Sequence, residues 1–155
     1  MTLEEISASL LNGFHDAGLE HIVIDYATAT VSIRFDVFLG LPVEDLTIRE
    51  RYAKASVLIK GMQYCVIEKP EDNGHGLPSH FDSTVNDFET SSQPQIAADL
   101  PELEENHFAH SFFVNGWNSF IHVAAQSAEL TFDDPADRIY NDAEMKRLTA
   151  GSSRS

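Results

Sequence analysis

The chain has 155 residues, of which 43% are hydrophobic, and it carries 10 Lys and Arg against 25 Asp and Glu, a formal net charge of −15. This length and apolar content suit one domain with a sizeable core. Scattered cations in so acidic a chain argue against nucleic-acid binding, which needs clustered Lys and Arg at the phosphates. The acidity has two explanations, solubility alone or a surface complementary to a basic partner protein, and the second is the sharper hypothesis.

Membrane and export signals are not expected in this chain. No run of about 18 apolar residues is present, and the opening MTLEEISASLLNG lacks the basic stretch of a secretory signal. We therefore expect a cytoplasmic protein of bacterial origin that does not enter a membrane. The single cysteine, Cys65, lies in an apolar run, and we interpret it as a small buried hydrophobic residue rather than a reactive thiol.

The first residues predict a short amphipathic helix. Thr2 followed by Glu5 is the pattern of a capping box, and apolar residues recur at helical spacing from Leu3 to Leu10. Gly13 supplies a stop signal, because glycine tolerates the left-handed conformation that ends many helices. We expect this helix to pack on a sheet.

Strands are predicted next along the chain. Residues 21–26 (HIVIDY) and 30–38 (TVSIRFDVF) predict two antiparallel strands, and the second alternates apolar and polar residues as a strand with one buried face does. Residues 43–51 are charged and expected to be exposed. Residues 52–67 predict one long strand bent at Gly61, or two short strands with a bulge at this glycine.

A long stretch at 69–95 is rich in Pro, Gly, Asn, Asp and Ser and is predicted to be a flexible insertion. Within it, apolar residues such as Val85 and Phe88 can pin a short element. Residues 100–106 (LPELEEN) predict an acidic turn, and residues 151–155 a disordered tail. The domain is thus expected to be a single unit of residues 1–150.

A hairpin is predicted around Asn115-Gly116, because this dipeptide tolerates the two positive φ angles of a type I′ turn. A two-residue loop would pair Val114 with Trp117 and His110 with Ile121, with Trp117 largely buried. A short third strand is expected at 129–132. Together these elements predict an α+β fold: an N-terminal helix packed on a mostly antiparallel sheet of about six strands, flat or curled into a sandwich.

Two histidines on the outer side of this hairpin, His107 and His122, would lie diagonally across from one another in that register. With a carboxylate they could hold zinc, but a third ligand and the usual HExxH or CxxC spacings are missing. The chain also has no P-loop, G-x-G-x-x-G or G-x-S-x-G motif. The sequence therefore favours a protein without metal, cofactor or enzymatic activity, with zinc at His107 and His122 and a hydrolytic function as the alternatives.

The pair His15-Asp16 stands at the junction between the helix and the first strand. An imidazole there can donate to backbone carbonyls, and an aspartate can accept backbone N–H groups, which would tie the helix onto the sheet. The alternative is a binding or catalytic dyad at the end of the sheet. The sequence is compatible with both interpretations.

The residues around this pair carry a resemblance. GFHDAGLEHIVIDY resembles the Phe-His-Asp-Ala opening, followed by a strand ending in Asp, of small bacterial proteins of unknown function and of some immunity proteins of polymorphic toxin systems. The likeness covers residues 10–38, with a looser echo in residues 116–130. Asn12-Gly13 stand where the family version has a tryptophan before the Phe. The resemblance implies a small mixed α and β protein that is not an enzyme and neutralises a partner protein.

The function predicted from the sequence is an acidic protein-binding domain, in its finer form an immunity protein that neutralises a basic toxin. The alternative is a small-ligand-binding or hydrolytic domain that uses His15 and Asp16 with His107 or His122, which a deep pocket with these side chains converging would favour. A homodimer through the sheet face or edge is a further expectation. The candidate binding residues are His15, Asp16, Glu102, Glu104, Glu105, His107 and His122.

Overall fold

The computed structural model describes residues 1–71, 83–89, 94–135, 137, 146–148 and 150. Its main feature is one sheet of eight antiparallel strands in the order β4-β7-β6-β5-β1-β2-β3-β8. This confirms the predicted α+β class, with eight strands where about six were expected. The strands are β1 (Ala17–Asp25), β2 (Thr30–Phe38), β3 (Tyr52–Lys60), β4 (Tyr64–Ile67), β5 (Thr84–Glu89), β6 (Phe108–Val114), β7 (Ser119–Ala125) and β8 (Ser127–Phe132).

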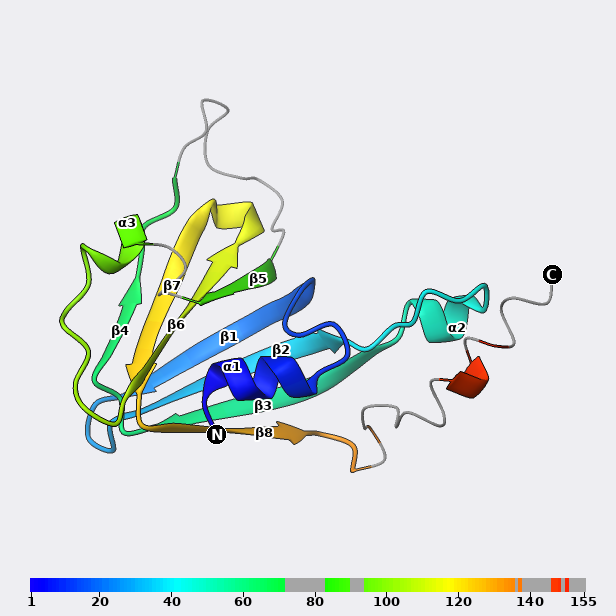
Figure 1. Cartoon of the computed structure of the whole chain (residues 1–155), viewed down its shortest axis with the longest axis horizontal. Coiled ribbons are helices and arrows are strands. Elements are labelled where there is room, and N and C mark those ends of the chain that lie inside the picture. Colours follow the sequence, from blue (N-terminus) through cyan, green and yellow to red (C-terminus); the bar gives the residue numbers. More distant parts are fainter. Residues whose placement is uncertain (72–82, 90–93, 136, 138–145, 149, 151–155) are drawn as a thin grey trace.

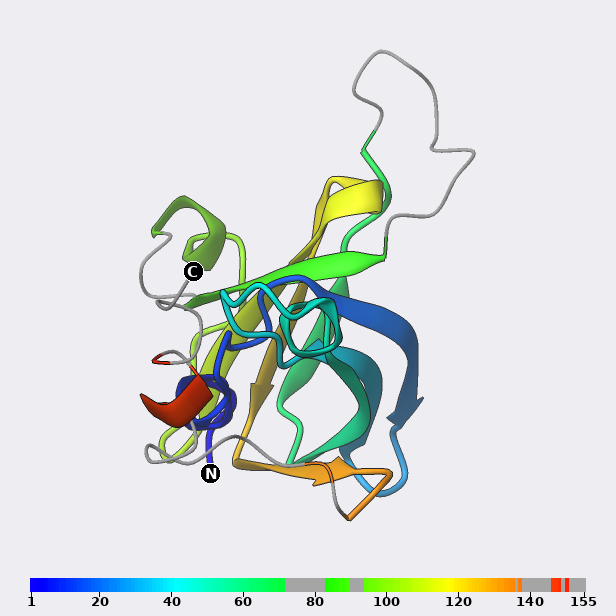
Figure 2. The same ribbon diagram turned by 90° about the vertical axis from the view of Figure 1, so that its right-hand side faces the viewer.

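The sheet curls around its core, and helix α1 (Leu3–Ser9) lies against its inner side (Figures 1 and 2). The predicted capping box is present: the Glu5 N–H donates to Thr2 Oγ1 at 3.0 Å, and the Thr2 N–H donates to Glu5 Oε2 at 2.7 Å. Leu3 and Ile6 are buried in the core. The helix ends at Ser9, and Gly13, with φ +57°, lies in the turn that follows it.

Three aromatic rings form the centre of the core. Phe14, from the turn after α1, packs 5.0 Å from Phe35 of β2 and 5.4 Å from Phe112 of β6, measured between ring centroids. All three side chains are buried. The Phe of the Phe-His-Asp-Ala stretch is therefore a packing residue that joins the helix end to both halves of the sheet.

The predicted strands 21–26 and 30–38 form the hairpin of β1 and β2, and β2 has the alternating burial that its sequence predicts. The charged residues 43–51 include a short helix, α2 (Leu46–Arg49), whose first turn is capped by Asp45. Arg49 and most neighbours of α2 are exposed, as expected, but Val43 is buried.

The predicted bend at Gly61 is confirmed. β3 and β4 flank this glycine, which has φ +66° and packs so closely against Gln126 that a side chain would collide with it. Gln126 is itself the corner between β7 and β8, and its N–H donates to the Lys60 carbonyl at 3.1 Å. Two bent strands thus turn together, and their arms pair as β3 with β8 and β4 with β7.

The loop length predicted for the central hairpin was wrong. Its loop has four residues, a 3-10 turn η2 (Asn115–Trp117) and Asn118 with φ +45°, so Val114 pairs with Ser119 rather than Trp117. The register is displaced by two residues, which leaves every side chain on its predicted face because the strand period is two. Trp117 lies in the loop and is partly buried, not largely buried as expected.

Within the predicted insertion at 69–95, the short element that Val85 and Phe88 were expected to pin is a strand of the sheet. Residues 84–89 form β5, which pairs with β1 and β6 in the middle of the sheet, and Val85 is fully buried. Residues 72–82 and 90–93, and the tail 151–155, lie outside the described residues. Within the part that the structure describes, no helix is both long and apolar enough to cross a membrane.

Candidate protein-binding face

The basic residues of β2 and β3 are matched by carboxylates on neighbouring strands. Arg34 pairs with Glu20 and Asp133, Lys54 with Glu20 and Asp36, and Lys60 with Glu129. The hydrogen bond from Lys54, with the nearby charge of Arg34, holds the pKa of Glu20 below its ordinary value of 4.5, although burial acts in the opposite direction. On this side of the sheet, the charges largely compensate one another.

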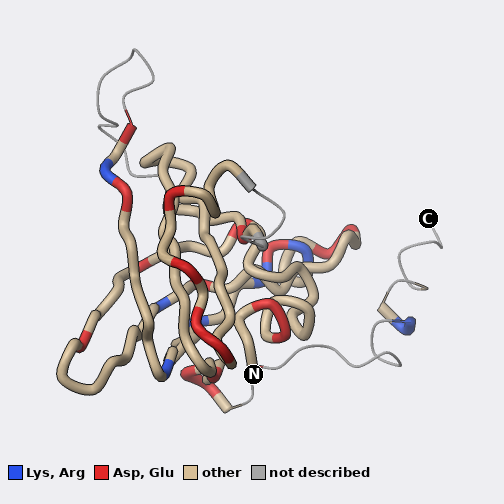
Figure 3. Tube along the Cα trace, turned by 60° about the vertical axis from the view of Figure 1, so that its left-hand side comes forward, with Lys and Arg blue, Asp and Glu red and all other residues tan. Residues whose placement is uncertain are grey.

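The other end of the sheet carries an acidic segment, residues 99–105. It contains Asp99, Glu102, Glu104 and Glu105, all exposed. Among the described residues, no Lys or Arg lies within 4.0 Å of these four carboxylates. Figure 3 shows acidic positions following one another on this side of the molecule. The predicted residues Glu102, Glu104 and Glu105 are therefore brought together, and their charges stay uncompensated.

Gln63, at the bend between β3 and β4, holds the acidic segment in place. Its side-chain Nε2 donates to the Glu102 carbonyl at 2.7 Å, and its Oε1 accepts from the Glu104 N–H at 3.0 Å. One amide thus uses both of its groups to bind the backbone on either side of Leu103. The carboxylates are left to project from a segment whose backbone is already fixed.

His107 supports the same segment from its far end. Only 9% of its side chain is exposed, its Nδ1 lies 2.9 Å from the Glu105 carbonyl oxygen, and its Nε2 lies 3.8 Å from Glu104 Oε2. Its ring is thus engaged with the turn before β6. His107 is a residue that shapes the acidic segment rather than one that projects toward a partner.

His122 sits between two oxygen atoms on the side of the sheet away from the core. Its Nδ1 lies 2.7 Å from Ser111 Oγ, and its Nε2 lies 3.0 Å from Glu68 Oε2. The other carboxylate oxygen of Glu68 accepts from the Phe120 N–H at 2.8 Å. Burial raises the pKa of Glu68, but the hydrogen bonds from His122 and Phe120 outweigh it and hold the pKa below the ordinary 4.5.

A serine, a histidine and a glutamate in a row have the composition of a hydrolytic triad, but their placement does not suit that chemistry. Ser111 is completely buried within β6, and His122 is 2% exposed, so the hydroxyl cannot meet a substrate. The most accessible member is Glu68, whose side chain is 41% exposed. The hydrogen-bonded series Ser111, His122 and Glu68 is therefore a structural link between β6, β7 and the end of β4.

A cavity of about 240 Å³ opens beside this link. Its apolar walls are Val66 of β4 with Ile96 and Leu100, which belong to helix α3 (Pro94–Ala97) and the turn after it. Carboxylates of Glu68 and Asp99 also line it. An aliphatic stem with a cationic end, as in Lys or Arg, matches these walls and charges.

Three phenylalanines extend this face away from the acidic segment. Phe120 packs 5.1 Å from Phe113 and 5.8 Å from Phe88 between ring centroids, and it stacks on His122 at 5.5 Å. All three rings are half-buried. Acidic groups therefore border an aromatic surface formed by β5, β6 and β7.

His15 and Asp16 lie elsewhere, at the turn between α1 and β1. Their side chains are 64% and 49% exposed, with His15 Nε2 3.4 Å from Asp16 Oδ2. His15 Nδ1 lies 2.5 Å from Asn86 Oδ1 on β5, so the pair is tied to a side chain rather than to the backbone carbonyl we expected. Asp16 has φ +57°, a left-handed conformation. The four side chains of the hydrolytic alternative do not converge.

The histidines of the central hairpin are also farther apart than predicted. In the observed register His122 lies opposite Ser111, four residues from His107, which corresponds to roughly 13 Å along a strand. Among the described residues, no group of three or more His, Cys, Asp or Glu is arranged to hold a metal ion. The diagonal contact between the two rings was a wrong prediction that followed from the two-residue loop.

The sequence analysis did not name Glu68, Asp99 or Ser111 as site residues. Alternation alone places Ser111 and His122 on one face, but pairing them requires the four-residue loop.

Cys65 is half-buried, and burial raises its thiol pKa to about 11, which fits the expected apolar role. A scan against protein-family models and searches of curated proteins and of solved structures found no match to this chain.

Proposed function

We propose that the chain is a binding protein, not an enzyme, and that a basic partner protein docks on the acidic segment and the adjoining face of β4, β6 and β7. One observation carries this proposal. The carboxylates of Asp99, Glu102, Glu104 and Glu105 have no Lys or Arg in ion-pair range among the described residues, whereas Arg34, Lys54 and Lys60 on the other strands are all paired.

Uncompensated charge on one side of a protein acts on the approach of a partner. A surface of one sign attracts a partner of the opposite sign over a distance of about 8 Å at physiological salt, and it raises the association rate more than the final affinity. The hydrogen bonds of Gln63 and His107 add a second benefit, because a segment that is ordered before binding loses less conformational entropy in the complex.

Affinity in this proposal comes from the aromatic part of the face. Buried aromatic residues and arginines supply most of the binding energy in protein interfaces. Phe113 and Phe120 are half-buried and pack on one another, and Phe120 stacks on His122, which lines the cavity of about 240 Å³. That cavity can receive the side chain of a Lys or Arg from the partner. The acidic segment would then attract the partner, and the neighbouring phenylalanines and cavity would hold it.

The finer form of the proposal is that the partner is a toxin and that binding neutralises it. Its support is the resemblance of residues 10–38 to immunity proteins, within which Phe14 serves the core and His15-Asp16 form an exposed turn. A second copy of this chain is a poor partner for the acidic segment, because like charges would face one another. A homodimer would have to use another surface.

The experiment is a capture of partners from the source cell with three baits. The first is the natural chain, and the second carries Glu102→Gln, Glu104→Gln and Glu105→Gln. The third carries Glu4→Gln, Glu44→Gln and Glu50→Gln, which remove the same charge from exposed positions on α1 and around α2. Captured proteins are identified by mass spectrometry.

The proposal predicts a basic protein that is retained by the first and third baits and lost from the second. For the immunity form, production of that protein alone should arrest growth, and co-production of the natural chain should restore it. Equal retention by the second and third baits would contradict the acidic segment as the docking site. A retained partner that is itself acidic would contradict the whole proposal.

A further inference from the structure

Strand β1 leaves the middle of the sheet soon after it begins. It pairs with β5 only through Ala17 and Gly18, with one more hydrogen bond from the Leu19 N–H to the Ser83 carbonyl at 2.8 Å. The β1–β2 register then shifts between Leu19 and His21, as at a β-bulge. The inner surface of β6 and β7 near the hairpin loop is therefore not covered by β1, and a cavity of about 300 Å³ opens there.

Apolar side chains from three directions line this cavity. Leu19 and Ile22 come from β1, Ile67 comes from the end of β4, and Val114, Trp117 and Ile121 come from the central hairpin. Ile67 is 54% exposed, a large value for an isoleucine at the mouth of an apolar cavity. Pockets of this size with mostly apolar walls and a few polar groups are the usual form of small-molecule sites.

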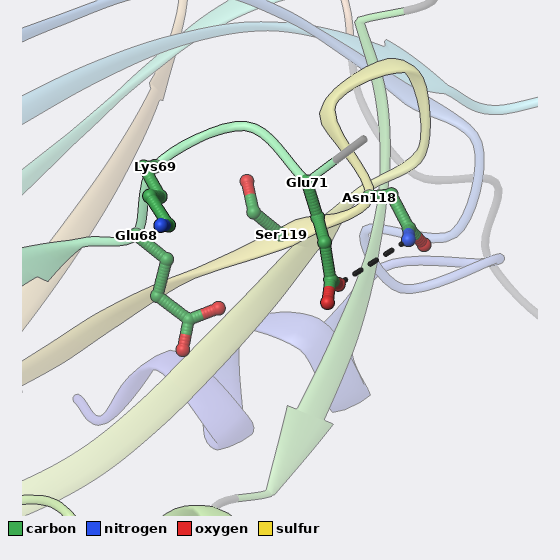
Figure 4. A pocket seen from close by; sticks show the side chains of 5 residues that line it. All are labelled: Glu68, Lys69, Glu71, Asn118 and Ser119. Carbon is green, nitrogen blue, oxygen red and sulfur yellow. Dashed lines mark hydrogen bonds between the residues drawn. The ribbon is translucent and has the colours of Figure 1, made fainter. Parts of the chain in front are cut away.

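The polar residues that line this cavity are Glu20, His21, Glu68 and Ser119. Ser119 is 7% exposed as a residue, and none of the described residues hydrogen-bonds its hydroxyl, which is left open to the cavity. A hydroxyl that faces a cavity without a protein partner can bond to the head group of a ligand. Ser119 also lines a second, polar space of about 340 Å³ with Glu68, Lys69, Glu71 and Asn118. Figure 4 shows its hydroxyl pointing into the space between Lys69 and Glu71.

The other polar groups of that space are partly engaged. Glu68 accepts from His122 and from the Phe120 N–H, and Glu71 accepts from Asn118 at 3.3 Å. Two carboxylates and one ammonium group, that of Lys69, give the space a net negative charge in a chain that is already strongly acidic. The negative charge disfavours an anionic ligand. The two carboxylates that line the apolar cavity are already engaged through both oxygens, Glu20 with Lys54 and Arg34 and Glu68 with His122 and the Phe120 N–H, so neither is free to pair with a cationic ligand.

We infer that the cavity between β1 and the central hairpin is a binding site for a small neutral amphiphile, with its apolar body among Leu19, Ile67 and Trp117 and its hydroxyl or carbonyl at Ser119. The volume sets the size of the body. A dry apolar cavity of about 150 Å³ admits benzene, so one of about 300 Å³ admits roughly twice as many carbon atoms. The cavity opens on the inner side of the sheet, and it shares Glu68 with the cavity of the proposed protein-binding face.

The test uses the whole chain and 1-octanol as the probe. Trp117 is the only tryptophan and lines the cavity, so its emission reports directly on occupancy. The inference predicts a saturable change in emission with 1-octanol, and much weaker binding of octanoate and of octylammonium. Ser119→Ala should weaken 1-octanol binding by about three- to tenfold, because it removes one hydrogen bond.

A matched pair of variants on β4 locates the site. Ile67→Glu places a charge at the apolar mouth and should abolish the response, whereas Val66→Glu, on the opposite face of the same strand, should leave it unchanged. Both residues are exposed enough for the variants to fold, which circular dichroism checks. If Ile67→Glu does not fold, Ser119→Ala decides.

Three results would overturn the inference. The first is an emission of the natural chain that does not saturate with 1-octanol. The second is a folded Ile67→Glu or Ser119→Ala variant that binds 1-octanol as tightly as the natural chain. The third is octanoate or octylammonium binding more tightly than 1-octanol, which would contradict the neutral head group.

Discussion

His122 Nε2 lies 3.0 Å from Glu68 Oε2, and this contact joins the middle of β7 to the first residue after the edge strand β4. Because its hydrogen bonds lower the pKa of Glu68 in the folded protein, the ionised carboxylate stabilises the fold. The sign follows from linkage: this stability is present above the ordinary pKa of 4.5 and is lost as the pH falls through the lower value of the folded state.

Glu68→Gln should therefore lower the melting temperature at pH 7, and the gap to the natural chain should narrow as the pH falls below 4.5. Thermal unfolding followed by circular dichroism across this range measures the gap. In a His122→Asn background, the same substitution should have a smaller pH-dependent effect, because the imidazole that bonds to Glu68 Oε2 is gone and the Phe120 N–H is left. A gap that widens in acid would contradict the assignment.

Phe14→Ala should be strongly destabilising. The ring is fully buried and contacts Phe35 and Phe112, so its removal leaves a cavity between the helix end and both halves of the sheet. We expect a loss of about 3–5 kcal/mol in the free energy of unfolding. Chemical denaturation measures it, with Tyr26→Ala, at a residue 82% exposed, as the control that should change little. A small effect at Phe14 would contradict the packing described.

Asp16 tests whether the His15-Asp16 pair acts through its charge or its backbone. A φ of +57° is unfavourable for alanine, whereas Asp tolerates it because its short polar side chain can bond to the nearby backbone. Asp16→Ala should therefore lower the free energy of unfolding by about 1 kcal/mol. Asp16→Gly and Asp16→Asn should each stay within about 0.5 kcal/mol, because both residues accept this conformation. If Asp16→Asn costs as much as Asp16→Ala in chemical denaturation, the carboxylate is the important group.

Local patterns predicted the elements whose signals are short in range. The capping box at Thr2, the alternation of β2 and the bend at Gly61 depend on neighbours within a few residues, and all three are present. β5 was harder to place, because its six residues stand in a stretch rich in turn-forming residues and gain their order by pairing with β1 and β6. Non-local pairing of this kind leaves little trace in a single sequence.

The candidate site was predicted in part. Glu102, Glu104 and Glu105 could be named from their charge alone, but the clamp of Gln63 comes from a residue about 40 positions away. The link from Ser111 through His122 to Glu68 needed the correct hairpin register, which Asn118 determines by taking the left-handed conformation. The Asn115-Gly116 dipeptide correctly predicts a turn at this point, but it does not determine how many residues the loop contains.

The most direct test of the acidic segment is the association rate of the captured partner, measured by stopped flow or surface plasmon resonance at two salt concentrations. Raising salt from about 0.05 to about 0.5 M shortens the screening length from roughly 14 to roughly 4 Å. The account predicts that the on-rate of the natural chain falls at least about tenfold while the off-rate changes little. The variant with Gln at 102, 104 and 105 should start slow and respond weakly to salt, unlike the variant with Gln at 4, 44 and 50. An on-rate that is indifferent to salt, or equal in the two variants, would contradict the account.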